Sequence, residues 1–571
     1  MRVPWSYLKR VLAGAIFGLY MAHLLYFLNP QIDITPARLA SVTIVYGLIC
    51  GLLFGSALWA LRFVRVKIFG ERDSGGQYRA HGFGLVVLAA FAAAAMYWMH
   101  LDVFRIYLPI GAIHVLGKAT NLITATAFAL LLIWVMERNA EPRRSRILFM
   151  FGVLLIAVSS FFLYERRDSY RTEKQTVVVA DIGTVAGQRP VIVIAVRNLP
   201  YDWILTMTGE GSLPFFERAR TRGYFTRLEP FPTLNPKALW ASIATGKLPF
   251  RHGVTGRFAY RTGLSGPDQF LMVPSGVGFN IWGLIPPVER MGSQLPSGDA
   301  LPLWSLFERL GLHAAVIGWP SSVARGATRV VTDEFFAAAN KTREVAPPSF
   351  MLEAQRLAQT PPAAAIQRFN GTGAARQRII SGLTADLSTI AIARATASDP
   401  RFPLTVAVLG GFEVTQRAIH IFTNDLPPRS NMKGEVLRAY VEQIDAMVAA
   451  VAREFPDHLL VVLSPSGPVP PRLPTTALAY VRDMFASDDP GADDGFVLIS
   501  GEGVAHHEKP GAAVPADIVP TVLYAAGLPV GRDMDGRVLT DAFVEDVLRR
   551  NSLLLVQTYE AKELVVRRGG A

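Results

Sequence analysis

Five apolar segments in the first 164 residues constrain the fold more than any other feature of the chain. They run approximately over Val11–Leu28, Leu39–Leu61, Gly82–Met99, Ala119–Met136 and Ile147–Tyr164. Each approaches the roughly 20 mostly apolar residues that cross a hydrocarbon core of about 30 Å. Hydrophobic residues make up 51% of the whole chain, and they concentrate in this part. We therefore predict an all-α transmembrane module of about five helices, followed by a globular domain.

Basic residues beside the apolar segments predict their orientation. The clusters precede the first segment and follow the second and the fourth: Lys9, Arg10, Arg62, Arg65, Lys67, Arg72, Arg138, Arg143, Arg144 and Arg146. All lie on one side if the amino terminus is cytoplasmic, as the positive-inside rule requires. Five spans then place the globular domain in the periplasm, outside a multi-pass inner membrane. The first segment ends at Asn29-Pro30 without a small-residue cleavage site, so we predict an uncleaved anchor.

The short apolar segment 102–118 contains Arg105, Pro109 and His114. We expect it to be an interfacial or re-entrant piece on the outer face. A sixth span would move the globular domain into the cytoplasm, and both the short length of the segment and the basic cluster at Arg143–Arg146 argue against this. The formal net charge of +11 follows the membrane segments, so we expect a lipid bilayer and no nucleic acid as partner. The single cysteine, Cys50, excludes a cysteine-based zinc site or thiol nucleophile in the globular part.

Strand and helix patterns alternate after a connector over residues 166–189. The run Val191–Val196 is unbroken and β-branched, which is typical of a strand buried on both faces. Similar runs are Ala314–Gly318, Thr405–Leu409, Leu459–Leu463 and Gly495–Ile499, with helical patterns at Leu303–Leu310 and Glu435–Glu454. The alternation predicts a doubly wound α/β domain over 190–545, with a mostly parallel sheet and helices on both faces.

Two stretches interrupt this alternation. Residues 258–299 are rich in Gly, Pro and large apolar residues, and they predict an ordered insertion. Residues 337–397 are rich in Ala and Arg and predict a helical cap. Residues 546–571 are expected to be a C-terminal tail. In a doubly wound sheet, ligands bind beyond the carboxyl ends of the parallel strands, so functional residues are expected there.

The stretch Phe231–Val254 has the layout of a nucleophile loop that opens a buried helix. Pro232, Thr233, Asn235 and Pro236 form a turn, Ala238–Ala244 is a helical apolar run, and Thr245-Gly246-Lys247 and His252-Gly253 close the unit. Backbone N–H groups and the helix dipole favour an anion at such a turn. Two further motifs are Gly318-Trp319-Pro320, which follows a predicted strand, and DIVPTVLYAAGLPVGRDMDGRVL at 517–539.

Together these motifs resemble the type I phosphodiesterase/nucleotide pyrophosphatase branch of the alkaline phosphatase superfamily, over roughly 190–539. The layout of five spans and an outer domain also resembles lipoteichoic acid synthases and phosphoethanolamine transferases. The resemblance implies an alkaline-phosphatase-like sheet. It also implies two divalent metals, usually zinc, held by three Asp and three His beside a Thr or Ser nucleophile. One metal would activate the nucleophile and the other would stabilise the leaving oxygen.

The positions that match the family's site carry other residues. Arg197-Asn198 stands where the family has Asp-Gly, and Asn235 occupies the place of the nucleophile. Glu413 and Arg417 match an Asp and a His. Pro465-Ser466-Gly467 replaces Asp-His-Gly, and Gly491-Ala492-Asp493 replaces a Gly-x-His stretch. Only Glu413, with Asp493 as a further candidate, keeps a ligand-capable side chain, so we predict a site without metal or cofactor.

Several residues near the predicted site have two interpretations. Thr233 and Ser466 are either turn residues whose hydroxyls hydrogen-bond their own backbone, or candidates for a relocated nucleophile. His252 has either a structural role or a catalytic role. His506, His507 and Glu508 form an exposed loop or a new metal or acid–base site. Glu413 and Arg417 form an ordinary i, i+4 ion pair or a network with Arg197.

Arg197, Asn235 and Arg417 are also candidates for an anion site that works without metal. The competing interpretation is that an Arg197–Glu413 salt bridge replaces the metals and serves only the fold. We expect an inactive membrane-anchored homologue that binds, scaffolds or regulates in cell-envelope biogenesis. Its partner would be another envelope protein or an anionic glycan or lipid. The alternative is an active envelope phosphodiesterase or phosphoglycolipid transferase, with two zinc or manganese ions and a site remodelled around Glu413, Thr233 and the histidines.

Overall fold

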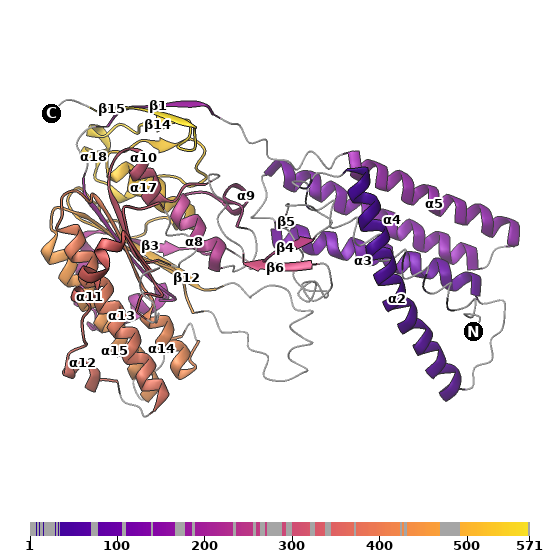
Figure 1. The fold of residues 1–571 in the computed structure, drawn as a ribbon, viewed down its shortest axis with the longest axis horizontal. Helices are drawn as coiled ribbons and strands as arrows, with labels where there is room; N and C mark the ends of the chain where they lie inside the picture. The colour runs from indigo at the N-terminus through magenta and orange to yellow at the C-terminus, as the bar shows by residue number, and fades with distance from the viewer. Residues whose placement is uncertain are drawn as a thin grey trace. The chain divides into compact units, whose positions relative to one another are not determined.

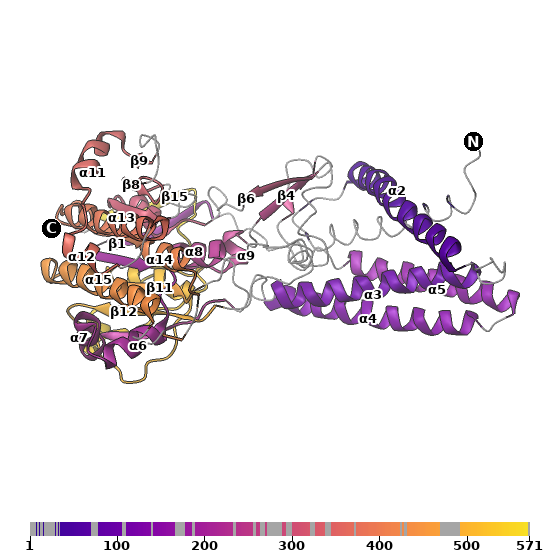
Figure 2. The ribbon, with the colours of Figure 1, turned by 90° about the horizontal axis from the view of Figure 1, so that it is seen from below.

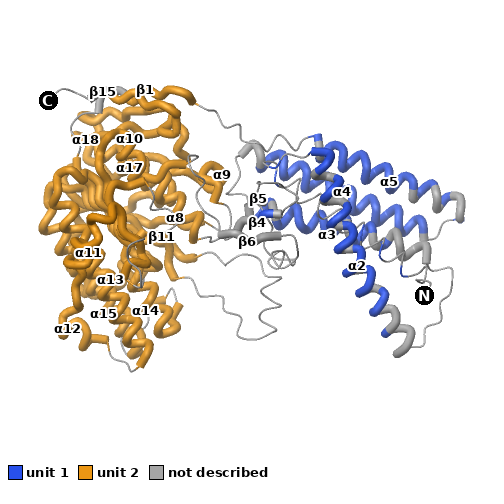
Figure 3. The backbone as a smooth tube through the Cα atoms, viewed as in Figure 1, with its two compact units in different colours: residues 1–174, 255–293, 474–488 blue, residues 175–254, 294–473, 489–571 orange. Residues whose placement is uncertain are grey.

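The computed structural model divides the chain into two compact units (Figure 3). Unit 1 comprises Met1–Lys174, Thr255–Ser293 and Pro474–Asp488, and unit 2 comprises Gln175–Val254, Gln294–Leu473 and Asp489–Ala571. The residues that the structure describes are 7, 11, 15, 29, 32, 35–69, 78–104, 110–138, 141–165, 177–185, 189–231, 236–254, 258–262, 269–270, 288–292, 300–319, 326–336, 344–369, 373–422, 425–426, 431–468 and 492–568.

Unit 1 contains four long helices among its described residues (Figure 1). They are α2 (Pro36–Phe69), α3 (Tyr78–Phe104), α4 (Ile110–Arg138) and α5 (Pro142–Glu165). Both α3 and α5 contact α4, as Figure 2 also shows. A small core of Val87, Ala90, Ala127, Leu130 and Ile133 joins α3 to α4. The expected segment Val11–Leu28 lies almost wholly outside the described residues.

The prediction of five membrane spans is not supported. Within the described residues, one helix, Ile113–Glu137, is long and apolar enough to cross a membrane. The other apolar helical stretches are Gly47–Ala57, Val86–Met99 and Met150–Leu163, which are shorter than the roughly 20 residues that a span requires. The expected interfacial piece at 102–118 is also wrong in part, because residues 110–118 form the first turns of α4. The predicted orientation of the globular domain depended on five spans, so it is not supported either.

An eight-stranded sheet forms the centre of unit 2. Its order is β3 (Tyr224–Leu228), β12 (Asp494–Ser500), β11 (Leu459–Ser466), β2 (Val191–Val196), β10 (Leu404–Leu409), β7 (Ala314–Trp319), β8 (Arg329–Thr332) and β9 (Val345–Ala346). Strands β11, β2, β10, β7 and β8 are parallel, whereas β12 and β9 run antiparallel to their neighbours. The predicted α/β class is confirmed as a mixed, mostly parallel sheet. All residues of β2, β10, β7 and β11 are buried, as their β-branched sequences indicate.

Helices cover both faces of the sheet (Figure 1). One face carries α6 (Tyr201–Gly209), α7 (Pro214–Arg222), α13 (Ala374–Ala397), α14 (Gly411–Ile419) and α15 (Met432–Glu454), whose apolar residues form one core with β2 and β11. The other carries α8 (Pro236–Thr245), α10 (Leu303–Arg309) and α17 (Ile518–Ala525). Because α13 contacts β10 and β7 directly, residues 374–397 of the expected helical cap form a core helix of the sheet.

Smaller elements complete the two units. In the expected insertion, β4 (Phe258–Thr262) pairs antiparallel with β5 (Gln269–Phe270) and β6 (Val288–Gly292). Unit 2 also holds α9 (Pro249–His252), α11 (Met351–Leu357), α12 (Ala363–Gln367) and α18 (Glu545–Arg550). Two strand pairs lie near the C-terminus: β13 (Val530–Gly531) with β14 (Leu555–Val556), and β1 (Val179–Val185) with β15 (Glu563–Arg568).

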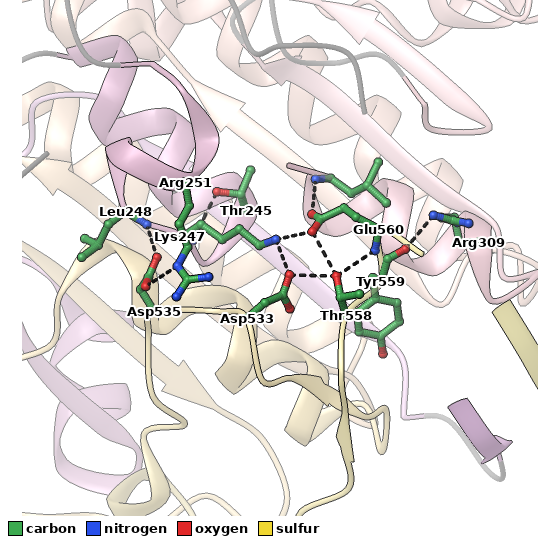
Figure 4. Close-up of polar contacts among 11 residues, drawn as sticks. Thr245, Lys247, Leu248, Arg251, Arg309, Asp533, Asp535, Thr558, Tyr559 and Glu560 are labelled. Atoms are coloured by element: carbon green, nitrogen blue, oxygen red, sulfur yellow. Dashed lines mark hydrogen bonds and ion pairs between the residues drawn. The ribbon is translucent and has the colours of Figure 1, made fainter. Parts of the chain in front are cut away.

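The Thr245-Gly246-Lys247 motif ends α8 and ties the C-terminal segment to the domain (Figure 4). The Lys247 side chain is only 5% exposed. Its Nζ donates to Asp533 Oδ2 at 2.6 Å and to the carboxylate of Glu560. Thr558 Oγ1 donates to the same Asp533 oxygen at 2.9 Å. One buried ammonium thus holds two carboxylates from a segment about 300 residues away in sequence.

Backbone contacts fix the same segment beside this cluster. Arg309 donates to the carbonyl oxygens of Tyr559 at 2.6 Å and Ala561 at 2.7 Å, and Glu560 Oε1 accepts from the Leu301 N–H at 3.0 Å. Burial alone would raise the pKa of Asp533, but the charge of Lys247 holds it below its usual value. The expected C-terminal tail is therefore held by buried polar contacts.

We predict that Lys247→Met destabilises unit 2 by about 3–5 kcal/mol, because two mostly buried carboxylates lose their cation. Thermal and urea unfolding of the full chain measure this loss. Arg549→Ala is the control: it removes an exposed i, i+4 pair with Glu545, which is worth only about 0.3–0.5 kcal/mol. Equal effects of the two substitutions would contradict the prediction.

Candidate functional site at the carboxyl edge of the sheet

The carboxyl ends of the parallel strands bring together residues that are far apart in the sequence. Arg197 follows β2, Glu413 lies in the first turn of α14 after β10, and Asp333 follows β8. Since these strands run in one direction, their ends share one edge of the sheet, where α/β proteins bind ligands. The structure therefore places Arg197 and Glu413 at the edge that the sequence indicated.

The guanidinium of Arg197 lies between two carboxylates. Its Nη2 donates to Asp333 Oδ2 at 2.9 Å, and its Nη1 lies 3.7 Å from Glu413 Oε2. The Arg197 side chain is 20% exposed and that of Glu413 is 17% exposed. Gly410 lies beside the guanidinium: a Cβ atom there would be 3.8 Å from Arg197 Nε. Arg197 therefore forms the network with Glu413 and adds a second carboxylate, Asp333.

The sequence interpretation missed Asp333, because the short strand β8 before it was not among the predicted strands. A signal exists in the sequence Arg-Val-Val-Thr-Asp at 329–333, where a carboxylate directly follows a β-branched run. A charged residue that directly follows a buried parallel strand lies at the carboxyl edge of the sheet, where ligands bind. Asp333 follows β8 in the same way that Arg197 follows β2.

Arg417 has a different environment from Arg197. Its guanidinium donates to Glu413, one helical turn earlier on α14, and its side chain is 60% exposed. Glu413 is thus shared between one mostly buried and one exposed arginine. The four side chains carry two positive and two negative charges, so the cluster has no net charge. Both open interpretations of Glu413, the i, i+4 pair and the network, describe contacts that the structure contains.

A fully buried carboxylate, Asp386 on α13, anchors the start of α14. Asp386 Oδ1 accepts from the N–H groups of Gly410 at 3.0 Å and Gly411 at 3.1 Å, and Oδ2 accepts from the Tyr440 hydroxyl at 2.9 Å. Burial raises the pKa of Asp386 to about 7, against the effect of these donors. A Cβ at Gly411 would lie 1.8 Å from the Tyr440 oxygen. No sequence motif indicates this role of Asp386, because the pattern of residues 337–397 predicts a cap.

The remaining predicted site residues are not brought to this cluster by the described part of the chain. Asn235 and Thr233 lie outside the described residues. Pro465 and Ser466 belong to β11, and Ser466 is buried with its hydroxyl donating to the Gly467 carbonyl at 3.2 Å. The carbonyl of Asp493 accepts from the Gly467 N–H at 2.8 Å. Burial and the nearby carboxylates of Asp202, Asp494 and Asp425 raise the Asp493 pKa.

The two histidine candidates differ in their surroundings. His252 is completely buried: its Nε2 is 3.0 Å from Ser242 Oγ, and its Nδ1 accepts from the Val254 N–H at 3.1 Å. These contacts hold α9 against α8, and burial lowers the pKa of His252 to about 3. His506 and His507 are exposed in a loop, where His506 Nδ1 lies 3.4 Å from the Gly223 carbonyl.

The described residues at this edge do not fit the pair of metal ions that the resemblance implies. Across the part of the chain that the structure describes, no group of three or more His, Cys, Asp or Glu side chains could hold a metal ion. Asp333 and Glu413, two carboxylates at this edge, are already paired with Arg197. A guanidinium cannot lose its proton at physiological pH and cannot ligate a cation.

Residues 191–469 match the family described as type I phosphodiesterase/nucleotide pyrophosphatase. Over this stretch, which is just under half of its 571 residues, the chain is similar to that family. The match includes Arg197, Asp333, Asp386, Glu413 and Arg417. No curated protein matches the chain.

Several solved structures are similar to parts of the chain at low identity. The alkaline phosphatase PafA is 12% identical, with 63% of this chain and 100% of that chain covered and a TM-score of 0.41. The phosphonate monoester hydrolase from Silicibacter pomeroyi is 15% identical, covering 63% and 78%, at 0.37. Murine ectonucleotide pyrophosphatase/phosphodiesterase 5 is 11% identical, covering 62% and 100%, at 0.36. At these values the likenesses say nothing about activity.

We predict that Asp386→Asn destabilises the fold by about 1–3 kcal/mol, because an amide cannot accept all the hydrogen bonds that the carboxylate accepts. Tyr440→Phe removes a single donor and should cost about 1 kcal/mol. Thermal unfolding of the two variants and the parent chain gives the comparison. An Asp386→Asn protein as stable as the parent would show that this carboxyl does not anchor α14.

His252 should contribute a loss of stability on acidification, which the raised pKa of Asp386 opposes over the same range. Its folded-state pKa, about 3, is below the ordinary value of 6.5. The unfolded chain therefore binds a proton that the folded chain does not, and stability falls as the pH drops through 6.5 toward 3. From pH 7 to 5 this amounts to about 2 kcal/mol.

Urea unfolding at pH 7 and pH 5 tests this dependence in the parent chain and in His252→Gln. The variant should be less stable at both values but should lose about 2 kcal/mol less between them. His507→Gln, at an exposed position, is the control and should retain the parent's pH dependence. If His252→Gln retains it as well, another group is responsible.

Proposed function

We propose that this protein is a membrane-anchored, catalytically inactive member of the phosphodiesterase/nucleotide pyrophosphatase family. It would act as a binding, scaffolding or regulatory subunit in cell-envelope biogenesis. The observation that carries the proposal is the position of Arg197, whose guanidinium lies between Asp333 and Glu413 at the carboxyl edge. A cation of the protein itself thus takes the carboxylates that a metal ion would need.

Electrostatics oppose a metal ion in this position. Two unit charges 4 Å apart at a partly exposed protein site repel each other by about 4 kcal/mol, and a divalent ion roughly doubles this. Arg417, the second cation of the cluster, adds to the repulsion from the other side of Glu413. The cluster is electrically balanced without metal, which favours a role in binding or architecture.

Membrane anchoring is supported by the surface of unit 1. The helix Ile113–Glu137 meets the requirement for a span, and only 33% of its apolar window is buried within the chain. On α5, large apolar side chains are 58–69% exposed: Ile147, Met150, Phe151, Leu154 and Phe161. An apolar surface of this kind requires lipid or another protein to cover it. We propose that lipid covers it around a single anchor, and the proposed role in the envelope rests on that anchor.

Metal analysis and an activity assay on the purified full chain test the proposal. We expect less than one equivalent of zinc or manganese, no hydrolysis of bis(4-nitrophenyl) phosphate, and an unfolding temperature that EDTA leaves unchanged. We expect this result because Arg197, and not a metal ion, neutralises the negative charges of Asp333 and Glu413 at this edge. Two equivalents of metal together with hydrolysis would overturn the proposal in favour of an active enzyme with a remodelled site.

A further inference from the structure

A cavity of about 640 Å³ lies at the amino edge of the central sheet of unit 2, at the opposite ends of the strands from the Arg197 cluster. Four residues that line it directly precede four neighbouring parallel strands: His458 before β11, Pro190 before β2, Pro403 before β10 and His313 before β7. The first residues of these strands are register partners, so the four residues lie in one row in this order. A cavity of this volume is within the range of small-molecule sites, about 300–1,000 Å³.

The middle of this row is apolar. Pro190 and Pro403 have no N–H group, and their carbonyl oxygens accept from the first N–H groups of β11 and β2 at 2.9 and 2.8 Å. Phe402 and Phe455 add two aromatic rings to the lining. Aromatic rings pack favourably against one another in offset or edge-on arrangements, so the lining suits a ligand with an aromatic body.

At one end of the row, His313 offers a hydrogen-bond acceptor. Thr328 Oγ1 donates its single proton to the carboxylate of Glu308, which also accepts from the N–H groups of Ala314 at 2.9 Å and Thr328 at 2.7 Å. The hydroxyl oxygen must therefore accept from His313 Nδ1, which is 2.9 Å away. A neutral imidazole with its proton on Nδ1 has an acceptor at Nε2. A ligand that bonds to this ring nitrogen has to donate an O–H or N–H group.

The charges around the cavity oppose a charged ligand. Burial lowers the pKa of His458, so this second imidazole is neutral at pH 7. Arg401 lines the cavity and is already paired with Asp399, with Nη2 donating to Oδ2 at 2.6 Å, and a cationic ligand would meet its guanidinium. Helices α13 and α15 both end at the cavity, and the carbonyl groups at a helix C-terminus carry partial negative charge. An anion would meet these carbonyl groups as well as the acceptor of His313.

We propose that the amino-edge cavity binds a neutral aromatic molecule with a hydroxyl or N–H donor, the chemistry that a phenol and an indole share. The ring packs against Phe402, Phe455 and the two prolines, and its donor meets His313 Nε2. This site goes beyond the proposed function and does not depend on it, because no residue of the Arg197 cluster lines the cavity.

Fluorine NMR of small probes with the purified full chain in detergent tests the proposal. The probes share one ring: para-fluorophenol has a donor, para-fluoroanisole has a methyl group in place of that proton, para-fluorobenzoate is an anion and para-fluorobenzylamine is a cation. Detergent alone gives the reference for each probe, because aromatic molecules partition into micelles. We expect fluorophenol to bind most tightly, and about tenfold more tightly than fluoroanisole, because of one hydrogen bond.

Two substitutions test where the probes bind. His313→Phe keeps a ring beside Phe402, which lies 5.9 Å from the imidazole between ring centroids, but removes the acceptor, so fluorophenol should bind no better than fluoroanisole. Leu312→Trp adds bulk at a partly exposed position that lines the cavity and should abolish binding of all probes. The matched controls are His507→Phe and Leu352→Trp, at exposed positions that do not line the cavity, and both should bind as the parent does.

Thermal unfolding shows whether each variant remains folded, and the comparison of fluorophenol with fluoroanisole on the parent chain is decisive even if a variant unfolds. Tighter binding of either charged probe, equal binding of fluorophenol and fluoroanisole, binding that survives Leu312→Trp, or no binding above the detergent reference would overturn the site. Each of these results would leave the expected metal content and inactivity of the protein unchanged.

Discussion

The placement of one guanidinium between two carboxylates governs the chemistry of the whole carboxyl edge. Arg197 sits at the end of the central strand β2, where it reaches Asp333 after β8 and Glu413 on α14. These contacts satisfy two acids that would otherwise repel each other at a partly buried position. The two carboxylates, which could otherwise have bound a metal ion, are therefore already paired with Arg197. With Arg417 included, the two positive and two negative charges at this edge balance without a ligand.

Buried polar groups hold the elements on which that placement depends. Asp386 accepts hydrogen bonds from the N–H groups that open α14, and α14 in turn carries Glu413 and Arg417. On the other face of the sheet, Lys247 ties α8 to Asp533 and Glu560. Both clusters join segments that are remote in sequence, and Lys247 and Asp386 at their centres are buried. Low local polarity strengthens such contacts when they are complete and makes them costly when they are broken.

The sequence predicted the central strands well, because burial on both faces demands unbroken apolar runs. Val191–Val196 was predicted to the residue, and the helix of the Trp240 motif was predicted within two residues of either end. The five membrane spans are not supported by the described residues, since apolar content alone does not reveal where a helix starts or how far its apolar stretch continues. Residues 374–397 of the expected cap were misjudged for a similar reason, because helical periodicity does not say which sheet, if any, lies beneath the helix.

At the carboxyl edge, too, the sequence and the tertiary structure determine different features. The sequence by itself determined that Arg197 follows one buried strand and Glu413 another, because both residues come after recognisable apolar runs. Only the tertiary structure decided their partners. Asp333 and Asp386 meet Arg197 and α14 from positions 136 and 25 residues away, and no local pattern encodes contacts across a sheet. Side-chain identity is local, whereas the neighbours that neutralise a charge are chosen by the packing of the whole domain.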